Sequence, residues 1–258
     1  MTSPGRVAFT VFGIDIMWYG ILIGLGFVLA VVISYRRAPL HHIESENILD
    51  FALWMIPLSI IGARAYYVIF DWDLYRGDPM SVFNIRAGGL AIHGGLIVGV
   101  IVGLCFCRVK KISVMELADL IFPTVALAQS IGRWGNFFNS EAHGTPTDLP
   151  WAILVDGQYV HPTFLYESLW CFALFWFLLW VDRRRKFPGQ IALLYGMLYS
   201  VERFCVEHLR TDSLMIGPFR QAQVLSAVVF IACLAAYIIL MQRSSGGQQT
   251  EIDQNKNQ

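Results

Sequence analysis

A polar stretch interrupts an otherwise apolar chain between Gly132 and Gly144, with the sequence GRWGNFFNSEAHG. Arginine offers a rigid fork of donors that matches a phosphate, and asparagine offers both donors and acceptors. Glycine permits a sharp turn or a close approach of the backbone to a ligand. Two interpretations are open from composition alone: a binding site for an anionic group, or a polar loop that caps a helix.

A second polar set recurs at helical spacing in a later apolar segment. Tyr199, Arg203, Glu207 and Arg210 follow one another at intervals of four, four and three residues, which places them on one helix face. Charged side chains inside an apolar span are costly and therefore indicate function. The alternative is a structural Arg203–Glu207 ion pair that neutralises buried charge.

His93 lies in a glycine-rich start of another apolar segment, GGLAIHGG. A histidine here is either a hydrogen-bonded packing residue or an acid–base group. No second histidine or carboxylate stands three or four residues away, so we expect no metal site.

Composition identifies the fold class that must position these residues. The chain has 258 residues, of which 56% are hydrophobic and 15% charged, as expected of an integral membrane protein. Its formal net charge is zero, so no basic field predicts a nucleic-acid partner. The five cysteines form no C-x-x-C pair and are interpreted as packing residues.

The apolar pattern predicts an all-α fold with seven transmembrane helices in residues 1–241. The predicted spans are 16–35, 48–70, 88–106, 114–132, 163–181, 190–209 and 221–241. Segments 71–87 and 133–162 form a small outer-face head segment, with a hairpin turning at Asp156-Gly157. Residues 242–258 are poor in apolar side chains and are expected to be a disordered cytoplasmic tail.

Basic residues set the predicted orientation. Most lysines and arginines follow the first, third, fifth and seventh spans, so these ends are cytoplasmic and the N-terminus lies outside. Polar residues from six of the spans then reach a similar depth in the outer leaflet: Tyr19, Arg64, His93, Arg133, Glu167, Arg203 and Glu207. This pattern favours an enzyme that acts on a phospholipid head group at the outer face. The alternative is an anion or lipid transporter, against which the absence of an internal repeat weighs.

These residues resemble the motifs of the bacterial phosphatidylglycerol–prolipoprotein diacylglyceryl transferase family. Gly132–Gly144 matches the signature G-R-x-G-N-F-x-N-x-E-x-x-G at every specified position. Four further segments match in the family's order: Trp18-Tyr19-Gly20, residues 88–95, His161-Pro162 with Tyr166-Glu167, and Tyr199 with Arg203 and Glu207. Phe164 departs from the pattern, since a glutamine is usual there.

The resemblance implies transfer of the diacylglyceryl group of phosphatidylglycerol to the lipobox cysteine in the signal peptide of a prolipoprotein. It implies no cofactor and a bacterial cytoplasmic (inner) membrane protein whose active site faces the outer leaflet. The catalytic residues would be His93, Arg133 and Arg203. The substrate-binding residues would be Tyr19, Arg133, Asn136, Asn139, Glu141, Gly144, Tyr199, Arg203 and Glu207. In this reading His93 takes the thiol proton, the two arginines hold the phosphate, and Gly144 gives the loop its turn.

Overall fold

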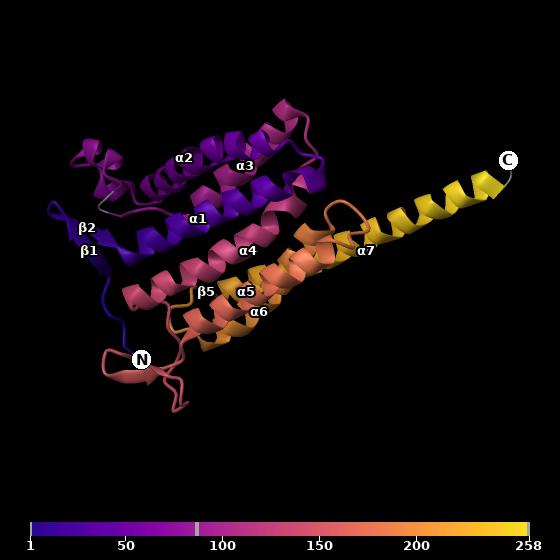
Figure 1. Ribbon diagram of the computed structural model, residues 1–258. Coiled ribbons are helices and arrows are strands. Elements are labelled where there is room, and N and C mark those ends of the chain that lie inside the picture. The colour runs from indigo at the N-terminus through magenta and orange to yellow at the C-terminus, as the bar shows by residue number, and fades with distance from the viewer. Residues whose placement is uncertain (1, 86–87, 257–258) are drawn as a thin grey trace. The chain divides into compact units, whose positions relative to one another are not determined.

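The computed structural model describes residues 2–85 and 88–256, with side chains described as far as Ser244. This part of the chain contains seven α-helices (Figure 1). They are α1 (Trp18–Arg37), α2 (Ser45–Phe70), α3 (Ile92–Lys110), α4 (Val114–Asn139), α5 (Thr163–Asp182), α6 (Gln190–Leu209) and α7 (Gln221–Lys256). Short 3-10 helices cover Ala38–His41, Trp72–Leu74 and Pro79–Phe83.

The strands form three small antiparallel hairpins within the described residues. They pair β1 (Val7–Val11) with β2 (Ile14–Met17), β3 (Ile153–Val155) with β4 (Gln158–Val160), and β5 (Met215–Ile216) with β6 (Phe219–Arg220). The predicted hairpin at Asp156-Gly157 is confirmed as β3–β4, in which Ile153 faces Val160. Both turn residues have positive φ, 48° and 79°, as a two-residue hairpin of this hand requires.

Six of the described helices are long and apolar enough to cross a membrane, which confirms an α-helical membrane protein. The exception to the predicted seven is α6. Glu202, Arg203 and Glu207 lie within this helix and lower its apolar content. The helix is nevertheless as long as α5, at 20 residues.

The predicted disorder of residues 242–258 differs from the structure, where α7 continues as a helix to Lys256. Once a helix is nucleated, each added residue costs little, so a polar extension can continue it. Asn257 and Gln258 lie outside the described residues.

The chain divides into two compact units, residues 1–33 with 118–258 and residues 34–117. In the first unit, α6 packs along both α5 and α7 (Figure 1). A buried apolar core joins α4, α5 and α6 through Leu127, Leu174, Leu178 and Ile191. This core fixes the three helices that carry most of the polar residues singled out above.

Buried hydrogen bonds set the relative positions of α4, α5 and α6. The Ser130 hydroxyl donates to the Ser168 carbonyl at 2.8 Å, and the Ser168 hydroxyl donates to the Ser130 carbonyl at 2.9 Å. Asp119 of α4 caps the start of α6. Its carboxylate accepts from the backbone N–H groups of Gly189 at 2.7 Å and Ala192 at 2.9 Å.

In the second unit, α2 and α3 approach closely where Gly62 faces Gly94, because a Cβ on either glycine would meet the opposite helix. Arg64 is buried on α2, and its guanidinium donates to five backbone carbonyls. Those carbonyls belong to Ser81, Val82, Asn84, Gly88 and Gly89. Arg64 therefore organises the segment before α3 and is not a free phosphate ligand.

Candidate functional site

The centre of the candidate site is the Glu167 side chain, which is 0% exposed near the start of α5. Its Oε1 atom lies 3.2 Å from Arg133 Nη2 of α4 and 3.2 Å from Arg203 Nη1 of α6. Its Oε2 atom lies 4.0 Å from Arg210 Nη1. One buried carboxylate thus gathers three arginines. We call these three arginines, with Glu167, Glu207, Asp212 and Tyr199, the arginine cluster.

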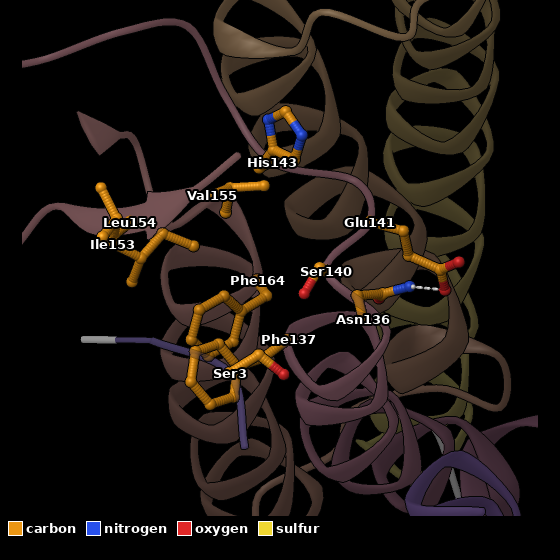
Figure 2. A pocket seen from close by; sticks show the side chains of 10 residues that line it. All are labelled: Ser3, Asn136, Phe137, Ser140, Glu141, His143, Ile153, Leu154, Val155 and Phe164. Atoms are coloured by element: carbon orange, nitrogen blue, oxygen red, sulfur yellow. Dashed lines mark hydrogen bonds between the residues drawn. The ribbon is translucent and has the colours of Figure 1, made fainter. Parts of the chain in front are cut away.

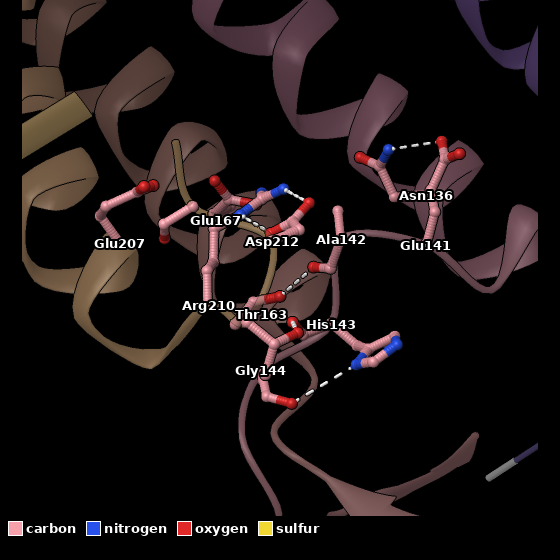
Figure 3. Close-up of polar contacts among 12 residues, drawn as sticks. Asn136, Glu141, Ala142, His143, Gly144, Thr163, Glu167, Glu207, Arg210 and Asp212 are labelled. Carbon is pink, nitrogen blue, oxygen red and sulfur yellow. Dashed lines mark hydrogen bonds and ion pairs between the residues drawn. The ribbon is translucent and has the colours of Figure 1, made fainter. Parts of the chain in front are cut away.

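The remaining contacts in the arginine cluster give each cation a second partner. Arg203 Nη2 lies 2.6 Å from Glu207 Oε2 one helical turn on, so the predicted i, i+4 pair forms. Arg133 Nη2 donates to the Tyr199 hydroxyl at 3.4 Å. Arg210 donates to both oxygens of Asp212, at 2.9 and 2.7 Å (Figure 3). Within the described residues the contacts of Arg133 use Nη2, which leaves its other donors for a further anion.

Arg210 and Asp212 lie just beyond the end of α6, and their ionisation is coupled. Burial disfavours the Asp212 carboxylate, but the hydrogen bonds and charge of Arg210 outweigh it and lower the pKa of Asp212. Burial likewise disfavours the Arg210 cation, but Asp212 and Glu167 outweigh it and raise the pKa of Arg210. The pair is therefore charged at neutral pH.

The signature residues lie on a helix for longer than the sequence suggested. The predicted span ended at residue 132, whereas α4 continues to Asn139 and carries Arg133 within its last two turns. A Cβ on Gly135 would meet the ring of Tyr19, so this glycine gives α1 a close approach to α4. Tyr19 itself belongs to α1 and is 40% exposed.

The loop after α4 is fastened to the starts and ends of neighbouring helices. The Gly144 N–H donates to the His161 carbonyl at 3.0 Å, and the Thr145 N–H donates to the Leu209 carbonyl at 2.8 Å. The Thr163 hydroxyl donates to the Ala142 carbonyl (Figure 3). The loop therefore holds the start of α5 against the end of α6, the two segments that carry Glu167 and Arg210.

The predicted role of Gly144 as the turn residue is wrong in its detail. The left-handed conformations occur at Ser140, with φ 55°, and at Ala142, with φ 56°. Gly144 is instead required by close packing, because a Cβ there would lie 2.7 Å from His161 Cβ and 3.2 Å from the Leu209 carbonyl.

Asn136, Asn139 and Glu141 form a separate polar group. Both amides donate to Glu141 Oε1, at 3.0 Å from Asn136 and 3.2 Å from Asn139. Figure 2 shows Asn136 and Glu141 at one side of a pocket whose other side is apolar, with Phe137, Phe164 and β3. Phe164, at the position where the family pattern has a glutamine, stacks on Phe137 with ring centroids 4.8 Å apart.

His93 belongs to the second unit, where it lies exposed at the start of α3 and stacks on Tyr66 at 6.1 Å between ring centroids. The structure therefore brings together Arg133, Arg203, Tyr199 and Glu207 of the predicted site residues, and groups Asn136 with Asn139 and Glu141. Within the described residues, no group of three or more His, Cys, Asp or Glu side chains could hold a metal ion.

Two residues in this region were not assigned to the site by the sequence. Glu167 appeared among the outer-leaflet polar residues and in a family motif but was given no site role, yet it is the shared partner of three arginines. Glu202, next to Arg203 on α6, is buried with both carboxylate oxygens unpartnered among the described residues. An acidic residue in an apolar span was the available signal for both.

Comparison with known proteins shows the family of the chain that carries this site. The model of the prolipoprotein diacylglyceryl transferase family matches residues 6–239. The chain belongs to this family.

Three similar members of the transferase family are each named phosphatidylglycerol–prolipoprotein diacylglyceryl transferase. The one from Finegoldia magna is 53% identical over 228 residues, which cover 88% of this chain and 92% of the relative. The one from Clostridioides difficile is 48% identical over 95% of this chain and 99% of the relative. The one from Bacillus cytotoxicus is 42% identical and covers 93% of each chain. The similarity thus extends over almost the whole length of this chain and of each relative.

Proposed function

We infer that this protein transfers the diacylglyceryl group of phosphatidylglycerol to the thiol of a prolipoprotein cysteine. The names of its relatives support this substrate pair and do not favour the alternative of an anion or lipid transporter. The observation that carries the inference is the convergence of Arg133 and Arg203 on Glu167, in a chain that matches the family model over residues 6–239.

The proposed reaction is a displacement at carbon. The thiol sulfur forms a bond to the glyceryl carbon of the diacylglyceryl group, the carbon–oxygen bond to phosphate breaks, and its electron pair leaves on the phosphate. The products are a thioether and glycerol phosphate, and the thiol proton is released. Negative charge grows on the leaving phosphate, so fixed guanidinium donors stabilise the transition state more than the substrate.

The protein's own residues have distinct proposed roles. Arg133 and Arg203 hold the phosphate through donors that their carboxylate contacts leave free, with Tyr19 and Tyr199 orienting the head group. His93 is the proposed acceptor of the thiol proton. A thiol with a pKa near ~8.5 already ionises by a few per cent at neutral pH, so His93 assists and the arginines are indispensable.

Asn136, Asn139, Glu141 and Gly144 are proposed to shape the site from its loop side, and Glu207 to hold Arg203 in place. Glu167 joins this set, since it orients Arg133 and Arg203 toward a common point.

We also propose a topology for residues 1–241. In it α6 also crosses the membrane, which gives seven spans in all, and its Arg203 is paired with Glu167 and Glu207. The N-terminus is outside, the C-terminus is cytoplasmic, and the head segments at 71–87 and 133–162 face outward with the arginine cluster. The membrane is the bacterial cytoplasmic membrane.

The deciding experiment uses the purified protein with phosphatidylglycerol and a synthetic lipobox peptide. Mass spectrometry should show a diacylglyceryl mass gain on the peptide cysteine, and none on the same peptide with serine in its place. Anion flux in protein-loaded liposomes without peptide modification would instead support the transporter alternative.

A further inference from the structure

Glu202 is a buried carboxylate that the proposed reaction does not use. It lies on α6 beside Arg203 and is 4% exposed. Among the described residues, neither Oε1 nor Oε2 has a hydrogen-bond partner. An ionised carboxylate in such a place is costly because nothing replaces the water it has lost, so the environment stabilises the neutral acid.

The groups that face Glu202 are those of the arginine cluster and its neighbours. Arg133 acts on it from α4, Glu167 from α5, and Arg203 and Arg210 from α6 and its end. Cys171 of α5 and Tyr199 of α6 are also within electrostatic reach. The third neighbour, α7, presents no charged side chain between Gln221 and Met241. The charge of Glu202 therefore interacts mainly with the arginine cluster.

The net charge around the arginine cluster depends on whether Glu202 carries its proton. Arg133, Arg203 and Arg210 are matched by the paired carboxylates Glu167, Glu207 and Asp212. Arg220 adds a fourth cation, which among the described residues donates to Ser213 and to the backbone carbonyls of Glu207 and Arg210 and to no carboxylate. With Glu202 neutral, these four arginines and three carboxylates carry one surplus positive charge. When Glu202 ionises, its negative charge cancels that surplus.

We propose that Glu202 is a positioning residue whose protonated form leaves the arginine cluster and Arg220 together the single positive charge that attracts the phosphodiester of phosphatidylglycerol. This inference rests on the proposed function, because a phosphodiester is the anion with one negative charge. Loss of the Glu202 proton would weaken binding of the anionic lipid without removing any arginine.

The test is the pH dependence of KM for phosphatidylglycerol, measured at saturating lipobox peptide. Over roughly pH 6 to 9 the phosphodiester and the arginines keep their charges, so a change in lipid KM reports on other groups. For the parent protein we expect the lipid KM to rise roughly tenfold across this range, as one added negative charge near the site would cause. Glu202→Gln, an isosteric mimic of the neutral acid, should keep a flat lipid KM.

Two further variants separate charge from packing. Glu202→Ala also lacks the ionisable group, so it should give the same flat profile even if its stability falls, and it serves if Glu202→Gln does not accumulate. Glu46→Gln removes an exposed carboxylate outside the cluster and should keep the parent's rise. A merely structural role for Glu202 would change protein yield and kcat but would not flatten the lipid KM.

The outcomes are distinct. A parent lipid KM that stays flat with pH, or a Glu202→Gln variant that rises like the parent, would overturn the inference. A parent protein that forms no thioether at any pH would overturn the proposed function itself.

Discussion

Arg133 of α4 and Arg203 of α6 approach the same atom, Glu167 Oε1, at 3.2 Å each. Two cations that share one buried anion repel each other, so the arrangement holds only while the carboxylate remains in place. We propose that the two guanidinium groups held in this way bind the phosphate of the lipid. This relationship makes Glu167 the support on which the proposed phosphate site depends.

Glu167→Gln should lower both activity and stability. Removing one partner of a buried ion pair costs about 3–5 kcal/mol, because the remaining charges are left uncompensated. Thermal unfolding of the detergent-solubilised protein should show a lower midpoint, and thioether formation should fall at least about tenfold. Asp50→Asn makes the same chemical change in the exposed Lys110–Asp50 pair and should alter neither by much. Equal midpoints for the two variants would contradict the role of Glu167.

Arg133→Lys should lose most of the transferase activity. Lysine keeps the positive charge but lacks the planar fork that contacts Glu167, Tyr199 and a phosphate together. The measurement is kcat/KM for phosphatidylglycerol in the peptide assay. Arg183→Lys, at an exposed position beyond α5, is the matched control. Near-normal turnover by the Arg133 variant would argue that charge alone suffices.

His93→Asn tests the proposed proton acceptor. If His93 takes the thiol proton, the variant depends on thiolate supplied by the medium, and its rate should climb more steeply with pH than the parent's. The measurement is kcat/KM for the peptide from about pH 6 to 9, around the ordinary thiol pKa. An unchanged profile would remove His93 from this role.

Gly144→Ala should destabilise the loop that joins the start of α5 to the end of α6. The added Cβ would lie 2.7 Å from His161 Cβ, closer than such atoms approach. We expect a cost of about 1–3 kcal/mol in the free energy of unfolding, as for other overpacked sites. Gly103→Ala is the control, because a Cβ there meets nothing within 4 Å and alanine favours a helix. A Gly144 variant as stable as the Gly103 variant would show that the loop yields.

Asp212→Asn should change how stability depends on acid. The pKa of Asp212 is lowered in the folded protein, so its contribution is present above the unfolded pKa of about 3.9 and is lost as pH falls through the folded value. The parent should therefore unfold at a higher temperature than Asp212→Asn near neutral pH, and the difference should disappear at strongly acidic pH. A difference that stays constant down to the lowest pH would show that the pairing with Arg210 is not its source.

Much of the fold followed from the chain's own pattern. Long apolar runs must be helices in a membrane because every backbone group needs an internal partner, and the observed helices lie near the predicted ranges. The β3–β4 hairpin was predicted because Asp156-Gly157 suits the positive φ values of a tight turn. The end of α4 was not, since Gly132 and Gly135 read as loop residues but allow α1 to pack closely.

The sequence by itself determined which residues are chemically unusual: arginines and glutamates in apolar spans, at spacings that place Tyr199, Arg203 and Glu207 on one face. Only the tertiary structure decided how they combine. It assigned Arg64 to backbone carbonyls and made Glu167 the common partner of Arg133 and Arg203. It also buried Glu202 with no hydrogen-bond partner among the residues that the structure describes. The physical reason is that periodicity fixes neighbours along one helix, whereas contacts between α4, α5 and α6 depend on side-chain packing across the core.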